Sequence, residues 1–139
     1  MVHADHIRLN TRGQTDVHDL TERLETIVER SGVKTGILTA FTPSSTSALT
    51  TIEFEPGAVE DLQRALDVIA PPSAEYRHNL RWGDGNGHSH LRAALLGPSL
   101  TIPILEARLC LGTWQQAIYL DFDVRPRQRE IIVQVIGES

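Results

Sequence analysis

The chain has 139 residues, of which 40% are hydrophobic and 22% are charged, as in an ordinary folded globular protein. Its formal net charge of −5 and its lack of a basic run argue against nucleic acid as a partner, because phosphate neutralisation needs a broad basic surface. No stretch approaches the roughly 20 apolar residues that cross a bilayer, and the N-terminus lacks the basic and apolar regions of a signal peptide. We therefore expect one soluble cytoplasmic domain over residues 1–139, with neither nucleic acid nor membrane as a partner.

The first half of the chain predicts three strands and two helices. The expected strands cover residues 2–11, 34–41 and 48–55. Thr15 or Asp16 can cap the first helix, since each offers a side-chain oxygen to free backbone N–H groups, and Gly32 can end it in a left-handed conformation. Pro56 suits the first turn of the second helix, which ends at Pro71.

The second half predicts strands at short intervals. These strands cover residues 100–106, 108–112, 116–122 and 131–136. Residues 81–90 are polar and hold three glycines, so we expect a loop there, and the short apolar run 91–96 fits a strand or a helix. Closely spaced strands favour antiparallel pairing, so the pattern predicts a β-rich α+β fold or a sandwich.

The densest cluster of reactive side chains lies between residues 76 and 90. It holds three of the six histidines, His78, His88 and His90, together with Asp84. Two histidines at i and i+2 of an extended segment share a face, and a third could complete a three-nitrogen site with the open fourth position that catalytic zinc needs. Asp84 could ligate the metal, orient a histidine or act as a base. The alternative is a solvated polar loop whose histidines have no joint role.

A second candidate segment covers residues 112–116. Thr113 offers a hydroxyl, two glutamines offer amides, and Trp114 could stack on a ligand ring or fill the core. The only cysteine, Cys110, precedes this segment and is flanked by apolar residues, so it predicts a buried structural thiol.

Two further segments could bind an anion or offer hydroxyls. Arg127 belongs to an arginine cluster that follows Asp121 and Asp123, and these arginines could hold an anionic ligand or pair with the carboxylates. Residues 42–47 are rich in hydroxyls, but the sequence shows neither the base nor the oxyanion hole that a serine nucleophile needs.

Taken in order, five stretches of the chain resemble the YjbQ family, also called the secondary thiamine-phosphate synthase family. They are residues 41–53, residues 76–90 with His78, Asp84, Asn86 and His90, residues 95–103 with Leu-Leu-Gly-Pro-Ser, residues 109–116 with Leu-Cys-Leu-Gly-Thr-Trp-Gln-Gln, and residues 123–137. The resemblance covers nearly the whole chain, and its Gly-Thr-Trp-Gln motif with the upstream Asp-x-Asn and His-Leu is specific.

The resemblance implies a compact antiparallel β-sandwich of jelly-roll-like arrangement, with two helices packed outside. It also implies a homotrimer with a polar pocket between neighbouring subunits. Family members carry a weak thiamine-phosphate synthase activity, which joins a hydroxyethylthiazole phosphate to an activated pyrimidine, so the resemblance implies a transferase acting on a phosphorylated small molecule.

The expected site residues follow from the matched motifs and from the polar residues around them. We expect His78, His90 and Asp84 to be catalytic, and we expect His78, His88 and His90 to be the ligands of a divalent metal, zinc before others, if one is bound. The expected ligand-binding residues are Ser44, Thr46, Asn86, Ser99, Thr113, Trp114, Gln115 and Arg127.

One position departs from the family pattern. The family has a histidine in a His-Thr-Thr or His-Ser-Thr motif after the early strand, where this chain has Ser44. The loss of a nitrogen ligand weakens metal binding, and His88 could take its place. Two functions therefore stay open: an enzyme of the thiamine-phosphate synthase type, and a trimer that binds a metabolite or metal without turnover because Ser44 has replaced the histidine. A purely structural trimer is a third possibility, against which the dense set of matched polar residues argues.

Overall fold

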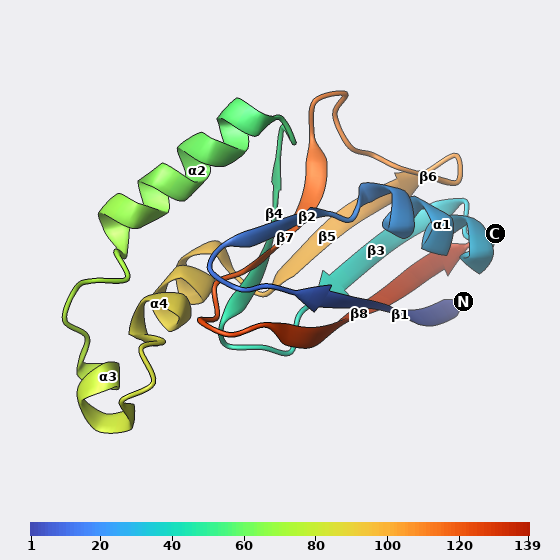
Figure 1. The fold of residues 1–139 in the computed structure, drawn as a ribbon. Coiled ribbons are helices and arrows are strands. Elements are labelled where there is room, and N and C mark those ends of the chain that lie inside the picture. The colour runs from blue at the N-terminus through green and yellow to red at the C-terminus, as the bar shows by residue number, and fades with distance from the viewer.

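A computed structural model describes all residues, 1–139, and shows an α+β protein built on two curled antiparallel sheets (Figure 1). Its strands are β1 (Val2–Thr11), β2 (Asp16–Asp19), β3 (Thr35–Phe41), β4 (Ser47–Ile52), β5 (Ser99–Leu105), β6 (Arg108–Leu109), β7 (Gln116–Asp121) and β8 (Arg127–Glu138). Its helices are α1 (Thr21–Ser31), α2 (Pro56–Ile69), α3 (Arg77–Trp82) and α4 (Gly87–Leu96). The larger sheet has the order β1-β8-β3-β5-β6, and the smaller has the order β2-β7-β4.

The main core lies between α1 and the larger sheet. Leu24 and Val28 of α1 are fully buried and pack with strand residues such as Leu38 and Val133. The apolar residues of α1 recur at helical spacing on one face, so the helix buries that face and leaves its charged side in water. Gly32 ends α1 with φ of 72°, the left-handed conformation that glycine adopts without steric cost.

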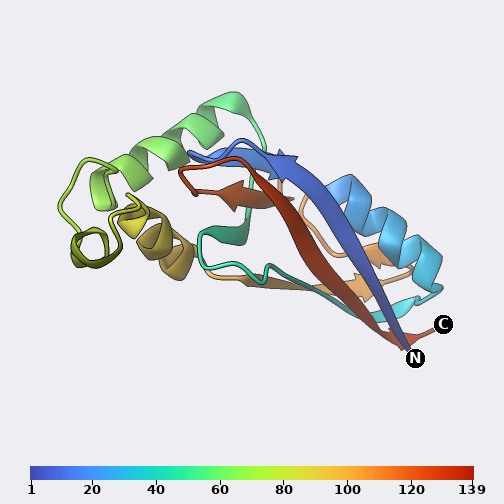
Figure 2. The ribbon, with the colours of Figure 1, turned by 60° about the horizontal axis from the view of Figure 1, so that its bottom comes forward.

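A second, smaller core lies beside the smaller sheet. Ala93 of α4 and Leu66 of α2 pack there against Ile118 and Phe122. Figures 1 and 2 show α2, α3 and α4 gathered at one end of the molecule, away from α1. None of the four helices combines the length and the apolar character needed to span a bilayer.

Several sequence expectations are wrong, and the structure gives the reasons. The first helix begins at Thr21, because residues 16–19 form β2 and pair with β7 instead of starting the helix. α3 and α4 occupy most of the segment that was expected to be a loop, and residues 91–96 complete α4, so there are four helices where two were expected. Cys110 is exposed, since it leaves the short strand β6 into the polar turn that follows.

Strand ends bring distant parts of the sequence together at one end of the sheets. Phe41 at the end of β3 pairs with Ser99 at the start of β5. Asp121 at the end of β7 pairs with Ser47 at the start of β4 and with Asp16 of β2. The turns that contain residues 42–46, 97–98 and 122–126 therefore meet at this end, where α4 also packs on β4.

Candidate functional site

Two histidines from different helices face each other. His78 of α3 and His90 of α4 have ring centroids 4.4 Å apart and ring planes tilted by 48°. Nδ1 of His90 lies 3.1 Å from the backbone oxygen of Ser45, which can only accept, so this nitrogen carries the proton. Nδ1 of His78 lies 3.3 Å from Oδ1 of Asn79 and 3.4 Å from Oδ1 of Asp84. No protein group bonds to Nε2 of either ring, so a ligand can reach both nitrogens. We call His78 and His90 the histidine pair.

His88 lies apart from the histidine pair. Since the segment is helical, residues two positions apart point to nearly opposite sides, and the expectation that His88 and His90 share a face of an extended segment is wrong. His88 is buried, with only 4% of its surface exposed, and its Nδ1 has no hydrogen-bond partner. Burial and the nearby Arg92 lower the pKa of His88, so its imidazole is neutral near pH 7.

Asn86 fixes the start of α4 next to the histidine pair. Its backbone N–H donates to Oδ1 of Asp84 at 3.1 Å. Its side-chain oxygen accepts from the backbone N–H of Val124 at 3.1 Å and lies 2.9 Å from Oγ of Ser89, whose hydroxyl donates to the backbone oxygen of Phe122. Asn86 is buried, so these bonds hold Asp84 and the first turn of α4 in register with the end of the smaller sheet.

Two buried carboxylates lie under this end of the sheets. Asp121 accepts from Nε of Arg129 at 2.7 Å, and Asp123 lies 3.3 Å from Nε of Arg127. Burial raises the pKa of Asp123, but hydrogen bonds, the first from the backbone of Arg125, outweigh burial and hold that pKa below its ordinary value. The interpretation of the arginine cluster as ion-pair partners of these carboxylates is therefore confirmed for Arg127 and Arg129.

Ser44 and Thr46 connect this carboxylate network to the histidine pair. Oγ1 of Thr46 donates to Asp123 at 3.1 Å and accepts from Arg129 at 2.8 Å. Oγ of Ser44 accepts from the backbone N–H of Thr46 at 3.2 Å. Ser45 lies between them and accepts from His90, so the turn links the buried carboxylates to one of the two imidazoles.

The structure brings together only part of the expected ligand-binding set. Ser44, Thr46, Asn86 and Arg127 lie in or beside the network, and exposed Ser99 begins β5 at the same end of the sheets. Thr113, Trp114 and Gln115 lie in the turn before β7, at the opposite end of the β4–β7 ladder. The six residues of β4 span roughly 17 Å, at about 3.3 Å per residue.

Trp114 does not fill the core. It is 74% exposed, while the amide of Gln115 accepts from Gly112 at 3.0 Å and donates to Thr51 at 3.2 Å. A tight turn thus presents Trp114 to solvent, and the ring is available to a partner molecule or ligand.

The comparisons with known proteins identify the family. The family model described as UPF0047 protein YjbQ-like matches residues 5–138. This chain belongs to the YjbQ-like family. A UPF0047 protein of Methanothermobacter thermautotrophicus is 37% identical over 137 residues, which cover 99% of this chain and 94% of that protein.

Solved structures agree with this assignment. The crystal structure of a YbjQ-like protein of unknown function from Sulfolobus solfataricus matches with a TM-score of 0.94 at 37% identity and covers 99% of both chains. A hypothetical protein from Aeropyrum pernix matches with a TM-score of 0.91 at 31% identity, covering 98% of this chain and 99% of that one. The resemblance to the YjbQ family is thereby confirmed. None of these three relatives is named for a reaction, so the function has to be argued from the site.

Two residues of the YjbQ-like site were missed by sequence reasoning. Asn79 contacts His78, and Ser89 donates to the backbone of Phe122 at 2.6 Å. Asn86 and Ser89 stand three positions apart, which is the spacing of a polar helix start, and that signal could have indicated α4.

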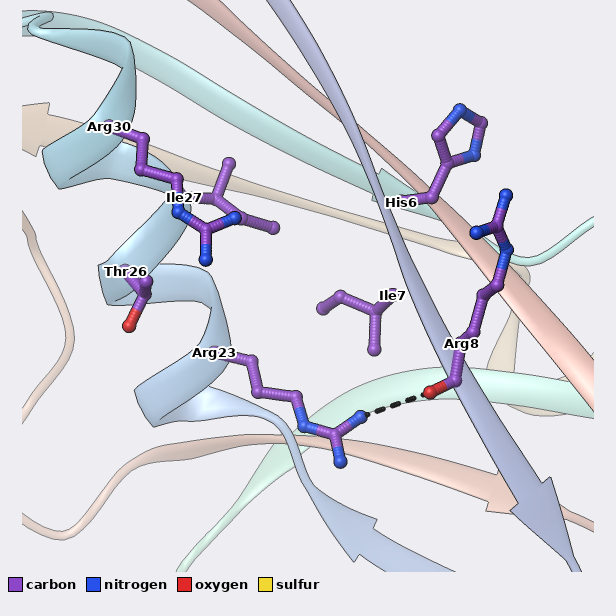
Figure 3. A pocket seen from close by; sticks show the side chains of 7 residues that line it. All are labelled: His6, Ile7, Arg8, Arg23, Thr26, Ile27 and Arg30. Carbon is purple, nitrogen blue, oxygen red and sulfur yellow. Dashed lines mark hydrogen bonds between the residues drawn. The ribbon is translucent and has the colours of Figure 1, made fainter.

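A groove between α1 and β1 is separate from this site (Figure 3). Its volume is about 210 Å³, and Arg23 and Arg30 of α1 stand over a floor formed by Ile7 and Ile27. Arg23 donates to the backbone of Arg8, and none of the expected site residues of the YjbQ-like chain line the groove. The groove therefore contributes no residue to the site around the histidine pair.

Proposed function

We propose that this YjbQ-like protein is an enzyme that acts on a small phosphorylated metabolite at the histidine pair. The observation that supports this proposal is that His78 and His90 face each other at 4.4 Å, each with Nδ1 near an oxygen acceptor and Nε2 without a hydrogen bond to the protein. An imidazole held in this way can accept a proton or hydrogen bond through Nε2, and when protonated it can bind an anion. Oδ1 of Asp84 lies 3.4 Å from Nδ1 of His78, close enough to orient its ring.

The proposed reaction is a transfer of the thiamine-phosphate synthase type. The ring nitrogen of a thiazole phosphate forms a bond with the methylene carbon of an activated pyrimidine, and the bond from that carbon to pyrophosphate breaks. The leaving group is an anion, so the site has to supply positive charge and hydrogen-bond donors instead of a nucleophile. His78 and His90 would supply both in their protonated forms, in which Nε2 carries an N–H group.

The separation of the expected residues supports a pocket shared between subunits. The turn with Trp114 and Gln115 lies at the opposite end of the β4–β7 ladder from the histidine pair, so one chain alone does not bring them together. In a symmetric assembly, this turn of one subunit can approach the histidine pair of the next. Trp114, which is 74% exposed, would then stack on a substrate ring in the shared pocket.

An exposed apolar face supports the homotrimer. Ile37 pairs with Ile136, and Phe41 pairs with Ile132, on neighbouring strands β3 and β8 of the larger sheet. All four side chains are between 37% and 47% exposed, and such patches on a small protein are typical of subunit contacts. We propose that a second copy of the chain covers this face, and the jelly-roll-like sandwich implied by the resemblance belongs to the same proposal.

A divalent metal fits the histidine pair only in part. Nε2 of His78 and Nε2 of His90 are suitable donors for zinc, but His88 points to the other side of α4. No three His, Cys, Asp or Glu side chains of the chain are grouped so that they could hold a metal ion. If zinc binds here, the substrate phosphate or a neighbouring subunit would have to complete its coordination.

A second candidate function is a trimer that binds the same kind of metabolite without turnover. Ser44 favours it, because its hydroxyl accepts from the backbone of Thr46 at 3.2 Å and cannot act as the imidazole that the family has here. The two functions share a binding site and differ only in whether product forms.

The test uses purified full-length protein and its His78→Ala and His90→Ala variants. We expect synthesis of thiamine phosphate, or another transfer onto a phosphorylated acceptor, to fall by about 10² to 10⁴ in each variant, which is the usual contribution of an acid/base group. Arg64→Ala on the exposed side of α2 is the control and should keep full activity. Elemental analysis of the same samples tests for zinc.

Binding of a thiazole phosphate without turnover in the wild type, with binding lost in both variants, would favour the second function. Unchanged binding and activity in His78→Ala and His90→Ala would show that the site lies elsewhere.

A further inference from the structure

A recessed cavity lies on the side of α4 that faces away from the histidine pair. Its volume is about 370 Å³, within the range of small-molecule sites. His88 and Arg92 of α4 line it, together with Asp67 near the end of α2 and Gln14 and Thr15 from the loop before β2. It shares no residue with the histidine pair, so the ligand that it could bind has to be inferred from its own lining residues.

Arg92 places a buried positive charge at this cavity. Only 3% of its side chain is exposed, although a guanidinium is rarely buried without full use of its donors. Its N–H groups donate to the backbone oxygen of Ala70 at 3.0 Å, to Oγ1 of Thr15 at 2.8 Å and to Oδ1 of Asp67 at 2.9 Å. A guanidinium has five N–H donors, so two of them lack a protein acceptor.

His88 adds a second buried polar group, of which one ring nitrogen, Nε2, lies 3.4 Å from Oγ of Ser89. It stands one helical turn before Arg92, and its Nδ1 is buried with no hydrogen-bond partner. Buried polar atoms in proteins are nearly always bonded, so an ordered water or a ligand atom is expected at this nitrogen. A neutral imidazole nitrogen can serve as donor or acceptor, so either kind of ligand atom can satisfy it.

The loop on the other side of the cavity is strained. Gln14 and Thr15 have φ of 54° and 65°, a left-handed conformation that side chains other than glycine rarely adopt. Their backbone N–H groups donate to the backbone oxygens of Asp123 and Asp121 at 2.8 and 2.9 Å, which holds the loop in place. Strained backbone of this kind clusters at ligand sites, where the surrounding structure determines it.

We propose that this cavity binds an oxyanion, the phosphoryl or carboxylate group of a small molecule, on the free N–H groups of Arg92 with His88 beside it. An arginine fork matches the oxygens of both groups, and the two buried side chains are rigid before the ligand arrives. This site is independent of the function proposed for the histidine pair.

Asp67 is the natural competitor for the ligand. Its carboxylate lies 2.9 Å from Nη2 of Arg92 and places a negative charge beside the ligand, so it opposes the binding of a second anion. Removing this competitor should strengthen binding, whereas an arginine with no ligand role would show no such response.

The experiment is a ¹H–¹⁵N NMR titration of the full-length protein with inorganic phosphate, acetate and phenyl phosphate. We expect saturable shifts of the Arg92 Nε–H signal and of the Gln14 and Thr15 amides. Arg92→Lys keeps the charge and loses the fork, so it should weaken binding about tenfold. Asp67→Asn should strengthen binding about two- to fivefold, the usual worth of an exposed ion pair. Arg64→Lys on the exposed side of α2 and His78→Ala should leave affinity unchanged.

Each outcome decides the question. Tighter binding of phosphate and phenyl phosphate than of acetate would assign a phosphoryl ligand, and the reverse order would assign a carboxylate. Both support the oxyanion site. Shifts that do not saturate with any probe, or equal affinities of the wild type, Arg92→Lys and Asp67→Asn, would overturn it. Loss of binding in His78→Ala would instead assign the ions to the histidine pair.

Discussion

Asp121→Asn should cost the fold a large part of its stability. The side chain of Asp121 is fully buried, and both of its oxygens accept from Arg129, at 2.7 and 3.0 Å. It also accepts from Thr11 and from the backbone of Asp123. An asparagine has one acceptor oxygen, so in either orientation its NH₂ group faces an N–H of Arg129.

The magnitude follows from the burial of the pair. Removal of one partner of a buried ion pair costs about 3–5 kcal/mol, because it leaves an uncompensated charge. Arg129 is 14% exposed and keeps Asp123 at 3.7 Å, which reduces the loss, so we expect a free energy of unfolding lower by about 3 kcal/mol. With a slope of about 2 kcal/mol/M in urea, the midpoint should fall by about 1.5 M.

The assay is urea unfolding followed by circular dichroism. Protein concentration is held fixed, because association would change the apparent stability. Asp61→Asn on the exposed side of α2 is the control and should change the midpoint little. In a double-mutant cycle with Arg129→Met, the double variant should lose less unfolding free energy than the two single variants lose together. A loss below about 1 kcal/mol for Asp121→Asn, or strict additivity in the cycle, would refute the coupled buried pair.

Three other predictions concern acid stability, close packing and assembly. Because the pKa of Asp123 is lowered in the fold, its carboxylate stabilises the protein above the ordinary value of about 3.9, and this contribution is lost as pH falls through the folded pKa. The urea midpoint of the wild type should therefore decrease as the pH is lowered below about 4. The midpoint of Asp123→Asn should decrease less. Gly36→Ala should cost at least about 1–3 kcal/mol in urea unfolding, because its Cβ would lie 2.1 Å from a backbone oxygen, whereas Gly112→Ala meets nothing closer than 3.5 Å and should be nearly neutral. If the apolar face of the larger sheet joins subunits, Ile136→Glu should give monomers in light scattering, while Val68→Glu, at an exposed position of α2, should not change the molar mass.

The strands were predictable because each long one buries a single face. β1 and β8 alternate buried and exposed side chains along most of their length, and the sequence shows this as alternation of apolar and polar residues. The short strand β2 was not predictable in the same way. It has four residues, it forms because β7 offers a partner, and Val17 and Leu20 also fit the helical spacing of α1.

The helix α4 was missed because its buried face is polar. His88, Ser89 and Arg92 are all less than 5% exposed, and hydrogen bonds instead of apolar contacts hold two of them in place. A search for apolar periodicity cannot detect such a face, and the nearby glycines indicated a loop instead. The same error placed His88 beside His90, which holds for an extended segment and fails for a helix.

The histidine cluster was visible in the sequence, but its supports were not. His78, Asp84 and His90 lie within thirteen residues, so their proximity was a reasonable prediction. The backbone oxygen of Ser45 and the carboxylate of Asp123 come from 45 and 37 positions away from their partners His90 and Asn86, and only the fold brings them together. Side-chain types alone carry no information about such pairings.

These supports imply that a buried carboxylate sets the geometry of the histidine pair. Asp123 binds Thr46, next to Ser45, and also binds Asn86, which begins α4. Both segments that hold His90 therefore depend on one side chain that is 2% exposed. His78 depends on Asn79 and Asp84 instead, so a change at Asp123 should move His90 more than His78. Two separate sets of contacts thus hold the two rings. The contacts that hold His90 depend on Asp123, which follows β7 of the smaller sheet.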